Sequence, residues 1–251
     1  MTEPARSPKS KLPIVHLLPN LLTIAAICAG LSAIKFGFQG NFELAVYLIL
    51  LACVLDGFDG RIARLLQAQS QIGAELDSLA DFLNFGVAPA LILYVWGLED
   101  LSRIGWIAVL IYATCCVMRL ARFNVSSKAG KEEEVDNSYF VGVPSPAGAF
   151  MVMLPMFISF LFPDMPSIPP LVIAVFTVVV GLLMISHIPT YSFKNLAIMR
   201  DQAKFFVLGV VLLAGALLTY LWATLVLLNV VYIVGILWAL QTSRKAKTKQ
   251  G

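Results

Sequence analysis

The chain has 251 residues, of which 59% are hydrophobic and 13% are charged, and its mean hydropathy is +0.84. Such a composition excludes an ordinary water-soluble domain, and the net charge of +3 is too small to indicate a nucleic-acid partner. The composition predicts an all-α, polytopic membrane protein.

The sequence divides into three parts. Residues 1–16 are predicted to form a cytoplasmic N-terminal tail, because they start with a polar, basic, Pro-containing stretch that lacks the apolar core and cleavage site of a signal peptide. Residues 17–240 are predicted to form one transmembrane domain. Residues 241–251 are predicted to form a basic cytoplasmic C-terminal tail.

Within the transmembrane domain, the sequence predicts about eight helical spans, since a span needs about 20 mainly apolar residues. The predicted spans are 17–38, 43–66, 72–95, 104–125, 146–162, 169–187, 204–219 and 221–240. The apolar run from Phe205 to Leu240 is too long for one crossing of a bilayer about 30 Å thick, so a tight turn is placed near Thr219–Trp222. Whether residues 204–240 form two spans is left open.

The positive charges predict the orientation. With eight spans both termini lie on one side, and this side then carries every Lys and Arg except Lys35 and Arg103. The positive-inside rule assigns this side to the cytoplasm. The protein is therefore expected in the cell (inner) membrane, with both termini and the hairpin between the second and third spans facing the cytoplasm.

That hairpin holds the main functional signal, four aspartates within otherwise apolar sequence. Asp56 and Asp59 are spaced i, i+3, and Asp77 and Asp81 are spaced i, i+4, so each pair shares a helix face. Four carboxylates in an apolar setting cannot all stay charged without cations. An all-oxygen ligand set favours Mg²⁺, Mn²⁺ or Ca²⁺, and two such ions form a common clamp for displacement at phosphorus.

Small residues and a cation accompany the aspartates. Gly60, Ala63 and Gly73 lie on the same helix faces and leave room for a ligand, and Arg64 offers a fork for phosphate. The alternative, a set of structural intramembrane ion pairs, is weaker because Arg61 and Arg64 cannot balance four acids.

These residues resemble the signature of the CDP-alcohol phosphotransferase family, D-x2-D-G-x2-A-R-x8-G-x3-D-x3-D, at all eight specified positions. The resemblance implies that Asp56, Asp59 and Asp77 hold metal, with Mg²⁺ or Mn²⁺ expected. It further implies that Asp81 binds a second ion and acts as general base, and that the substrate is CDP-linked. The residues expected to contact the nucleotide or the CDP-lipid are Asn20, Thr23, Gly60, Ala63, Arg64, Ser70 and Gly73. For Asn20 and Thr23, helix capping is the alternative.

Four further stretches resemble the bacterial and archaeal membrane-integral phosphatidylserine synthases. They read DSLADFLNFGVAPA at 77–90, RLARFN at 119–124, FVGVPSPAGA at 140–149 and PTYSFK at 189–194. The resemblance implies transfer of a phosphatidyl group from CDP-diacylglycerol to L-serine, giving phosphatidylserine and CMP. It also implies a homodimer surrounded by membrane lipids.

L-serine is a zwitterion, so its site needs a fixed cation for the carboxylate. Arg119, Arg122 and Lys194 are the candidates, with a simple role as positive-inside anchors as the alternative. Two other functions remain open. The acceptor could be glycerol 3-phosphate, inositol phosphate or choline, although a phosphorylated acceptor needs a larger cationic cluster. A cation transporter is the remote alternative, but it predicts acids along the whole membrane path.

Overall fold

The computed structural model describes residues 14–128, 139–186, 189–191 and 203–248, and nearly all of these residues are helical. The α-helices are α1 (Leu18–Phe38), α2 (Phe42–Leu65), α3 (Gln71–Asp81), α4 (Ala88–Leu93), α5 (Arg103–Lys128), α6 (Ser145–Val152), α7 (Leu154–Leu161), α8 (Pro170–Ile185), α9 (Ala203–Thr219) and α10 (Leu221–Thr248). The helical class is therefore as predicted. The described residues also contain one antiparallel strand pair, β1 (Tyr139–Val141) and β2 (Pro189–Tyr191), which the sequence pattern did not indicate.

In the part of the chain that the structure describes, four helical segments are long and apolar enough to cross a membrane, namely Val15–Phe38, Gln71–Leu101, Arg103–Val125 and Leu221–Gln241. The apolar helices Pro170–Ile185 and Val207–Thr219 are shorter. These lengths and compositions agree with a membrane protein. The number of eight crossings stays a prediction.

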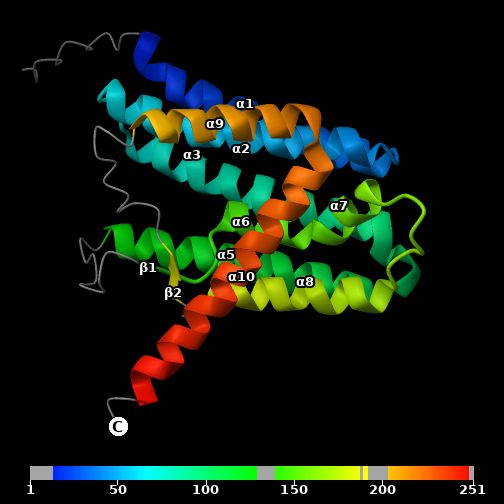
Figure 1. Cartoon of the computed structure of the whole chain (residues 1–251). Helices are drawn as coiled ribbons and strands as arrows, with labels where there is room; N and C mark the ends of the chain where they lie inside the picture. The colour runs from blue at the N-terminus through cyan, green and yellow to red at the C-terminus, as the bar shows by residue number, and fades with distance from the viewer. Residues whose placement is uncertain (1–13, 129–138, 187–188, 192–202, 249–251) are drawn as a thin grey trace, which may run out of the picture.

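The long helical segments run back and forth between two ends of the molecule (Figure 1). The connections after α1, before α5, after α7 and between α9 and α10 lie at one end, and the α2–α3 connection lies at the other end. This arrangement places the C-terminal part of α2 and the N-terminal part of α3 side by side. The predicted aspartate hairpin is thus formed at one end of the bundle.

Local sequence explains the α2–α3 hairpin. The helix α2 ends at Leu65, and Gln67 adopts a positive φ of 50°, which turns the chain. Ser70 then caps α3, because its Oγ accepts a hydrogen bond of 3.0 Å from the N–H of Gly73. The predicted hairpin between the spans 43–66 and 72–95 is confirmed.

The predicted span 72–95 lies within one continuous helical segment in which α-helical and π-helical turns alternate. Directly after Asp81 the α-helix gives way to a π-helical segment, η2 (Phe82–Val87), and after α4 to a second one, η3 (Tyr94–Leu98), followed by a 3-10 turn, η4 (Glu99–Leu101). Wide π turns are often found at functional sites. The sequence periodicity did not predict them.

One other predicted span differs from the structure. The span 146–162 is divided into α6 and α7 at Met153, because Pro155 has no N–H to donate to the carbonyl of Met151. The predicted tail 241–251 begins inside α10, which extends to Thr248, since the Arg, Lys and Ala residues of this segment have high helix propensity. The break between α9 and α10 falls at Tyr220, within the predicted turn.

Small side chains allow close packing of the first two helices. Ala26 and Ala33 of α1 and Ala45 and Ala52 of α2 are completely buried, and α1 and α2 form an extensive contact. Helices in membranes associate closely where small residues face each other. This packing holds the start of α1 beside the aspartate-bearing end of α2.

Candidate metal centre and active site

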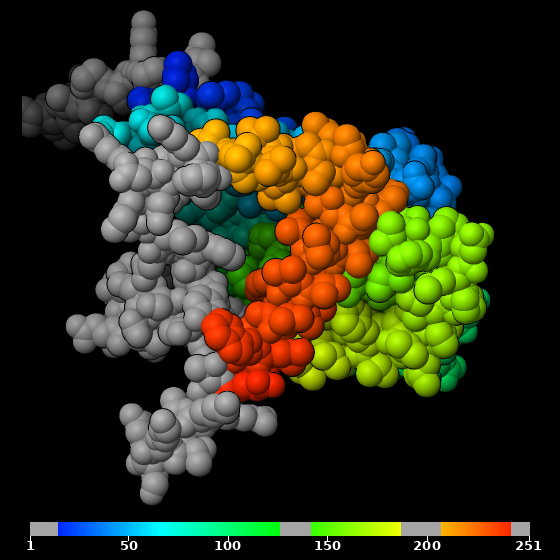
Figure 2. Space-filling model, viewed as in Figure 1, coloured from blue at the N-terminus to red at the C-terminus, as the bar shows by residue number. Residues whose placement is uncertain are grey.

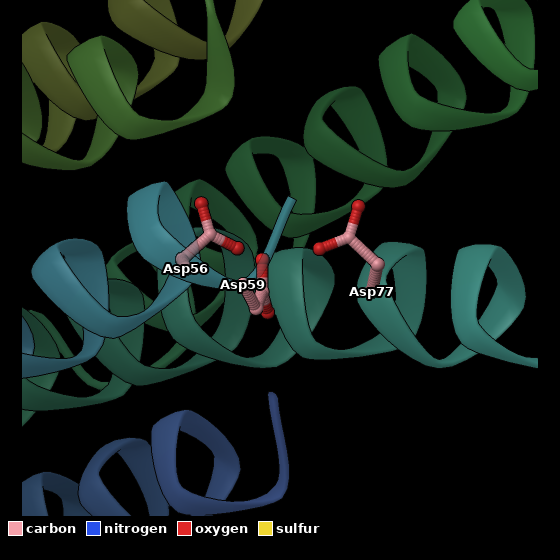
Figure 3. A group of neighbouring side chains, drawn as sticks. All are labelled: Asp56, Asp59 and Asp77. Atoms are coloured by element: carbon pink, nitrogen blue, oxygen red, sulfur yellow. The ribbon is translucent and has the colours of Figure 1, made fainter. Parts of the chain in front are cut away.

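Asp56 and Asp59 of α2 and Asp77 of α3 lie together at the hairpin. One carboxylate oxygen from each residue falls within 4.8 Å of the others. Figure 3 shows the carboxylates of Asp56 and Asp77 turned toward each other from neighbouring helices, with that of Asp59 between them in this view. The structure therefore assembles three of the four predicted ligands into one acidic cluster.

Asp81, the fourth predicted ligand, is connected to this cluster through Asp56. The two side chains lie within hydrogen-bonding range of each other, and Asp81 also interacts electrostatically with Asp77. Two carboxylates this close share a proton unless a cation lies between them and allows both to stay charged. Asp56 thus belongs both to the cluster with Asp59 and Asp77 and to the pair with Asp81.

The donor set fits a divalent cation with oxygen ligands. Oδ1 of Asp56 and Oδ1 of Asp81 are buried and have no hydrogen-bond partner among the described residues, so both remain available as ligands. Such buried, unpartnered oxygens are costly unless a cation or a bound substrate engages them. The cluster is therefore a suitable site for a divalent metal, and its all-oxygen chemistry fits Mg²⁺ or Mn²⁺ better than zinc.

Thr23 of α1 orients Asp59. Its Oγ1 lies 2.6 Å from Oδ2 of Asp59 and 3.1 Å from the carbonyl oxygen of Pro19, one turn earlier. Because both partners are acceptors and the hydroxyl has one hydrogen, the shorter contact identifies Asp59 as the main acceptor. Both Thr23 and Asp59 are only 3% exposed, so this hydrogen bond is sealed from solvent. The sequence had suggested Thr23 as a nucleotide contact.

The residues predicted to bind the nucleotide occupy both sides of the hairpin. Gly60 is exposed, and a side chain built at this position would meet no atom within 4 Å. Ala63 is half-buried, and Arg64 is exposed with its Nε donating to the carbonyl of Gly60 at 3.1 Å. The described residues therefore leave space for at least a Cβ atom beside the backbone of α2 at Gly60.

Asn20, Ser70 and Gly73 mark the place where α1 meets α3. A Cβ at Gly73 would lie 3.0 Å from Oδ1 of Asn20 and 3.0 Å from Oγ of Ser70. Glycine therefore permits a close approach that alanine would disturb. Ser70 also caps α3, so its hydroxyl already has a structural partner.

The three cations considered for serine differ in position. Arg119 is half-buried and donates from Nη1 to Oγ of Ser145 at 3.0 Å, and it interacts electrostatically with Asp81. Arg122 is exposed, and its Nη1 donates to the carbonyl of Ile185 at 3.2 Å, which ties α5 to the end of α8. Lys194 lies outside the described residues. Of the two described arginines, Arg119 is the one beside the aspartates.

Sequence reasoning missed several polar residues near the site. Ser78, next to Asp77, exchanges hydrogen bonds with Asn124 of α5 at 3.0 and 3.2 Å. Asn84, one turn after Asp81, is fully buried beside Gly30. Tyr232 of α10 is close enough to Arg119 to interact with it electrostatically. The spacing from Asp81 could have drawn attention to Asn84, but no sequence signal connects Tyr232 with a site more than 150 residues earlier.

The chain was compared with models of protein families. The family model described as CDP-alcohol phosphatidyltransferase matches residues 16–249, almost the whole chain and all four aspartates. The chain belongs to the CDP-alcohol phosphatidyltransferase family. Membership in this family agrees with the acidic cluster and with the apolar helices.

Several members of this family with curated names are similar to the chain. A Mycobacterium leprae protein named CDP-diacylglycerol–serine O-phosphatidyltransferase is 35% identical over 238 residues, 94% of this chain and 79% of that protein. A Helicobacter pylori protein of the same name is 33% identical over 223 residues, 89% of this chain and 91% of that protein. A Mycobacterium tuberculosis protein of that name is 51% identical over 135 residues, 54% of this chain. That match covers 47% of the relative, so it spans about half of its length.

Proposed function

We propose that this protein transfers a phosphatidyl group from CDP-diacylglycerol to the hydroxyl of L-serine, giving phosphatidylserine and CMP. The observation that carries the proposal is the acidic cluster of Asp56, Asp59 and Asp77, with Asp81 beside it, at the end of an apolar helix bundle. The relatives named for this reaction support serine as the acceptor. Glycerol 3-phosphate, inositol phosphate and choline are the alternative acceptors.

In this proposal, Asp56, Asp59 and Asp77 hold the first Mg²⁺ or Mn²⁺. Asp56, Asp77 and Asp81 hold a second ion, which is consistent with the position of Asp56 between the two carboxylate groups. Bound divalent ions neutralise charge on the transferring phosphoryl group and on the leaving phosphate. The hydrogen bond from Thr23 keeps the carboxylate of Asp59 in position.

The CDP end of the substrate is proposed to lie along the hairpin. Gly60 and Ala63 leave the face of α2 open, and Arg64 supplies positive charge beside the phosphates. Asn20 and Gly73, in close contact across α1 and α3, form the other wall. The lipid part can then extend along the apolar helices into the bilayer.

Asp81 is proposed as the general base. Its Oδ1 has no hydrogen-bond partner and can accept the proton of the serine hydroxyl. The hydroxyl oxygen attacks the phosphorus that carries the lipid, a new P–O bond forms, and the P–O bond to CMP breaks. The electron pair of that bond leaves with CMP, so the reaction balances without a covalent enzyme intermediate.

We further propose that the domain at residues 17–240 crosses the cell (inner) membrane eight times, with both termini and the active site at the cytoplasmic face. The positions of the connections at the two ends of the bundle support this topology (Figure 1). Single cysteines introduced at Gln69 and Asp164, in a variant without the native cysteines, should react with an impermeant thiol reagent from opposite faces. Reaction from the same face would contradict the eight-crossing topology. The homodimer implied by the family resemblance is a separate proposal, and cross-linking in membranes tests it.

The decisive experiment supplies purified protein with CDP-diacylglycerol and a panel of labelled acceptors, with Mg²⁺ or Mn²⁺ present. We expect phosphatidylserine and CMP in equal amounts, and no product after complete removal of divalent metal with EDTA. A different lipid product would show that another alcohol, and not serine, is the acceptor. Full turnover with verified absence of metal would overturn the metal assignment instead.

A further inference from the structure

Arg119 lies at the meeting point of three helices. It belongs to α5, its Nη1 donates to Ser145 at the start of α6, and it interacts electrostatically with Tyr232 of α10. The carboxylate of Asp81 is a further neighbour of the guanidinium. One cation is therefore surrounded by two hydroxyl groups and the proposed general base.

Two hydrogen-bond donors in this region have no partner. Nε of Arg119 and the hydroxyl of Tyr232 are both buried, and neither forms a hydrogen bond in the described structure. Buried donors without partners are rare in folded proteins, because the lost hydration is not compensated. Here two such donors, one of them on a charged group, come from different helices, and their side chains are close enough to interact electrostatically. An anionic ligand with two acceptor atoms would satisfy both.

We propose that Arg119 and Tyr232 together bind the carboxylate of the amino-acid acceptor, and that Tyr232 is thus a specificity residue contributed by the last helix. This inference rests on the proposed transfer to serine. One carboxylate oxygen accepts from Nε of Arg119 and the other accepts from the hydroxyl of Tyr232. Nη1 of Arg119 continues to donate to Ser145, which fixes the orientation of the guanidinium.

The position of Asp81 agrees with this assignment. The hydroxyl and carboxylate of serine are carried on adjacent carbon atoms, so the base and the carboxylate donors must be close neighbours. Asp81 and Arg119 are close enough to interact electrostatically, and Oδ1 of Asp81 is unpartnered. An alcohol without a carboxylate would leave both donors unpaired, and sites of this kind reject such analogues strongly.

The space-filling view shows a hollow beside the last two helices (Figure 2). In Figure 2 the molecule is hollowed beside α9 and α10, and deeper-lying teal and green segments are visible there. The helix α10 also packs against α6 and α7 and against the strand β2. Tyr232 is therefore held on a helix with several neighbours, which suits a residue that must present one hydroxyl to a ligand.

The test compares Tyr232→Phe with the unmodified protein in assays that vary serine and CDP-diacylglycerol separately. The change removes one hydroxyl and keeps the ring. We expect the KM for serine to rise about ten- to a hundredfold, the range for a hydrogen bond to a charged group, while the KM for CDP-diacylglycerol stays within about twofold. Arg119→Lys, which keeps the charge but removes the fork, should show the same separation.

Tyr220→Phe is the matched control, because Tyr220 is an exposed tyrosine that lies between α9 and α10, directly before the first residue of α10. It should leave both KM values unchanged. An unchanged serine KM in Tyr232→Phe, or an equal rise for both substrates, would overturn the inference while the proposed function stands. If the unmodified protein transfers nothing to serine, the proposed function itself fails.

Discussion

The two halves of the proposed site are built in different ways. The metal half comes from one hairpin, in which Asp56 and Asp81 are 25 residues apart and adjacent helices hold all four aspartates. The acceptor half combines Arg119, Ser145 and Tyr232 from α5, α6 and α10. The first half depends on helix periodicity and one turn, whereas the second depends on the packing of distant helices.

This difference suggests a division of labour. The metal half carries the chemistry common to a family of transferases, and it is encoded by a short, local pattern. In our proposal the acceptor half decides which alcohol is used, and it could change through single residues on separate helices without disturbing the metal cluster. Substitutions in the two halves should therefore have separable effects on turnover, metal dependence and serine binding.

The largest effect is expected for Asp56→Asn. Asp56 lies in the cluster with Asp59 and Asp77 and also contacts Asp81, so its loss removes a ligand from both proposed metal sites. We expect kcat/KM to fall on the order of a thousandfold or more, the scale of metal stabilisation of a phosphoryl transition state. Steady-state kinetics at saturating metal measure this change, and activity within tenfold of the unmodified protein would contradict the central role of Asp56.

A slightly smaller and more selective effect is expected for Asp81→Asn. Loss of a general base lowers kcat by about a hundredfold to ten thousandfold. Binding of CDP-diacylglycerol should be largely retained, because Asp56, Asp59 and Asp77 remain. Equilibrium binding of the CDP-lipid, measured beside kcat, distinguishes the two roles. Equal loss of binding in Asp56→Asn and Asp81→Asn would make Asp81 a metal ligand only.

Thr23→Val should have an intermediate effect that is visible in metal dependence. Removing the hydroxyl frees Asp59 from its 2.6 Å hydrogen bond, and partners of metal ligands typically contribute about ten- to a hundredfold to metal affinity or activity. The half-saturating Mg²⁺ concentration should rise by about this factor, and Thr23→Ser should restore it.

Thr177→Val is the control for this experiment. Thr177 is also buried, and its hydroxyl donates within α8 to the carbonyl of Ile173 at 2.8 Å. Its loss should leave metal dependence unchanged. If both valine variants shifted the Mg²⁺ requirement equally, the effect would arise from general destabilisation of the bundle.

The smallest effect is expected for Arg122→Ala. Its guanidinium is bound to the carbonyl of Ile185 and not to the region of Asp81. We expect a loss of stability of about 0.5–1.5 kcal/mol from one hydrogen bond, seen as earlier thermal unfolding in detergent. The serine KM should change less than in Arg119→Ala. A larger rise of the serine KM in Arg122→Ala than in Arg119→Ala would show that Arg122, and not Arg119, binds the serine carboxylate.

The helices and the hairpin were largely predictable from the sequence. The first predicted span, 17–38, agrees closely with α1, and the turn between α9 and α10 falls at Tyr220 as expected. The division at Met153, the π-helical turns after Asp81 and the strand pair were not predicted. They arise from a backbone group that Pro155 cannot supply, from wide turns without a sequence signature, and from pairing of segments far apart in the chain.

The site shows the same limit at the level of side chains. Asp59 was predicted as a ligand, but its hydrogen bond to Thr23 appears only once α1 lies beside α2. Arg119 and Arg122 are three residues apart and have the same chemistry, so the sequence ranked them together. Packing directs one toward Ser145 and Asp81 and the other toward the end of α8.

The sequence by itself determined the membrane class, the aspartate hairpin and the family, because hydropathy and helical spacing act over short stretches of chain. Only the tertiary structure decided that Asp56 lies beside Asp81 as well as beside Asp59 and Asp77. It also decided that Tyr232 interacts electrostatically with Arg119. Such contacts depend on how whole helices pack and rotate against each other, and no local pattern of residues records this packing.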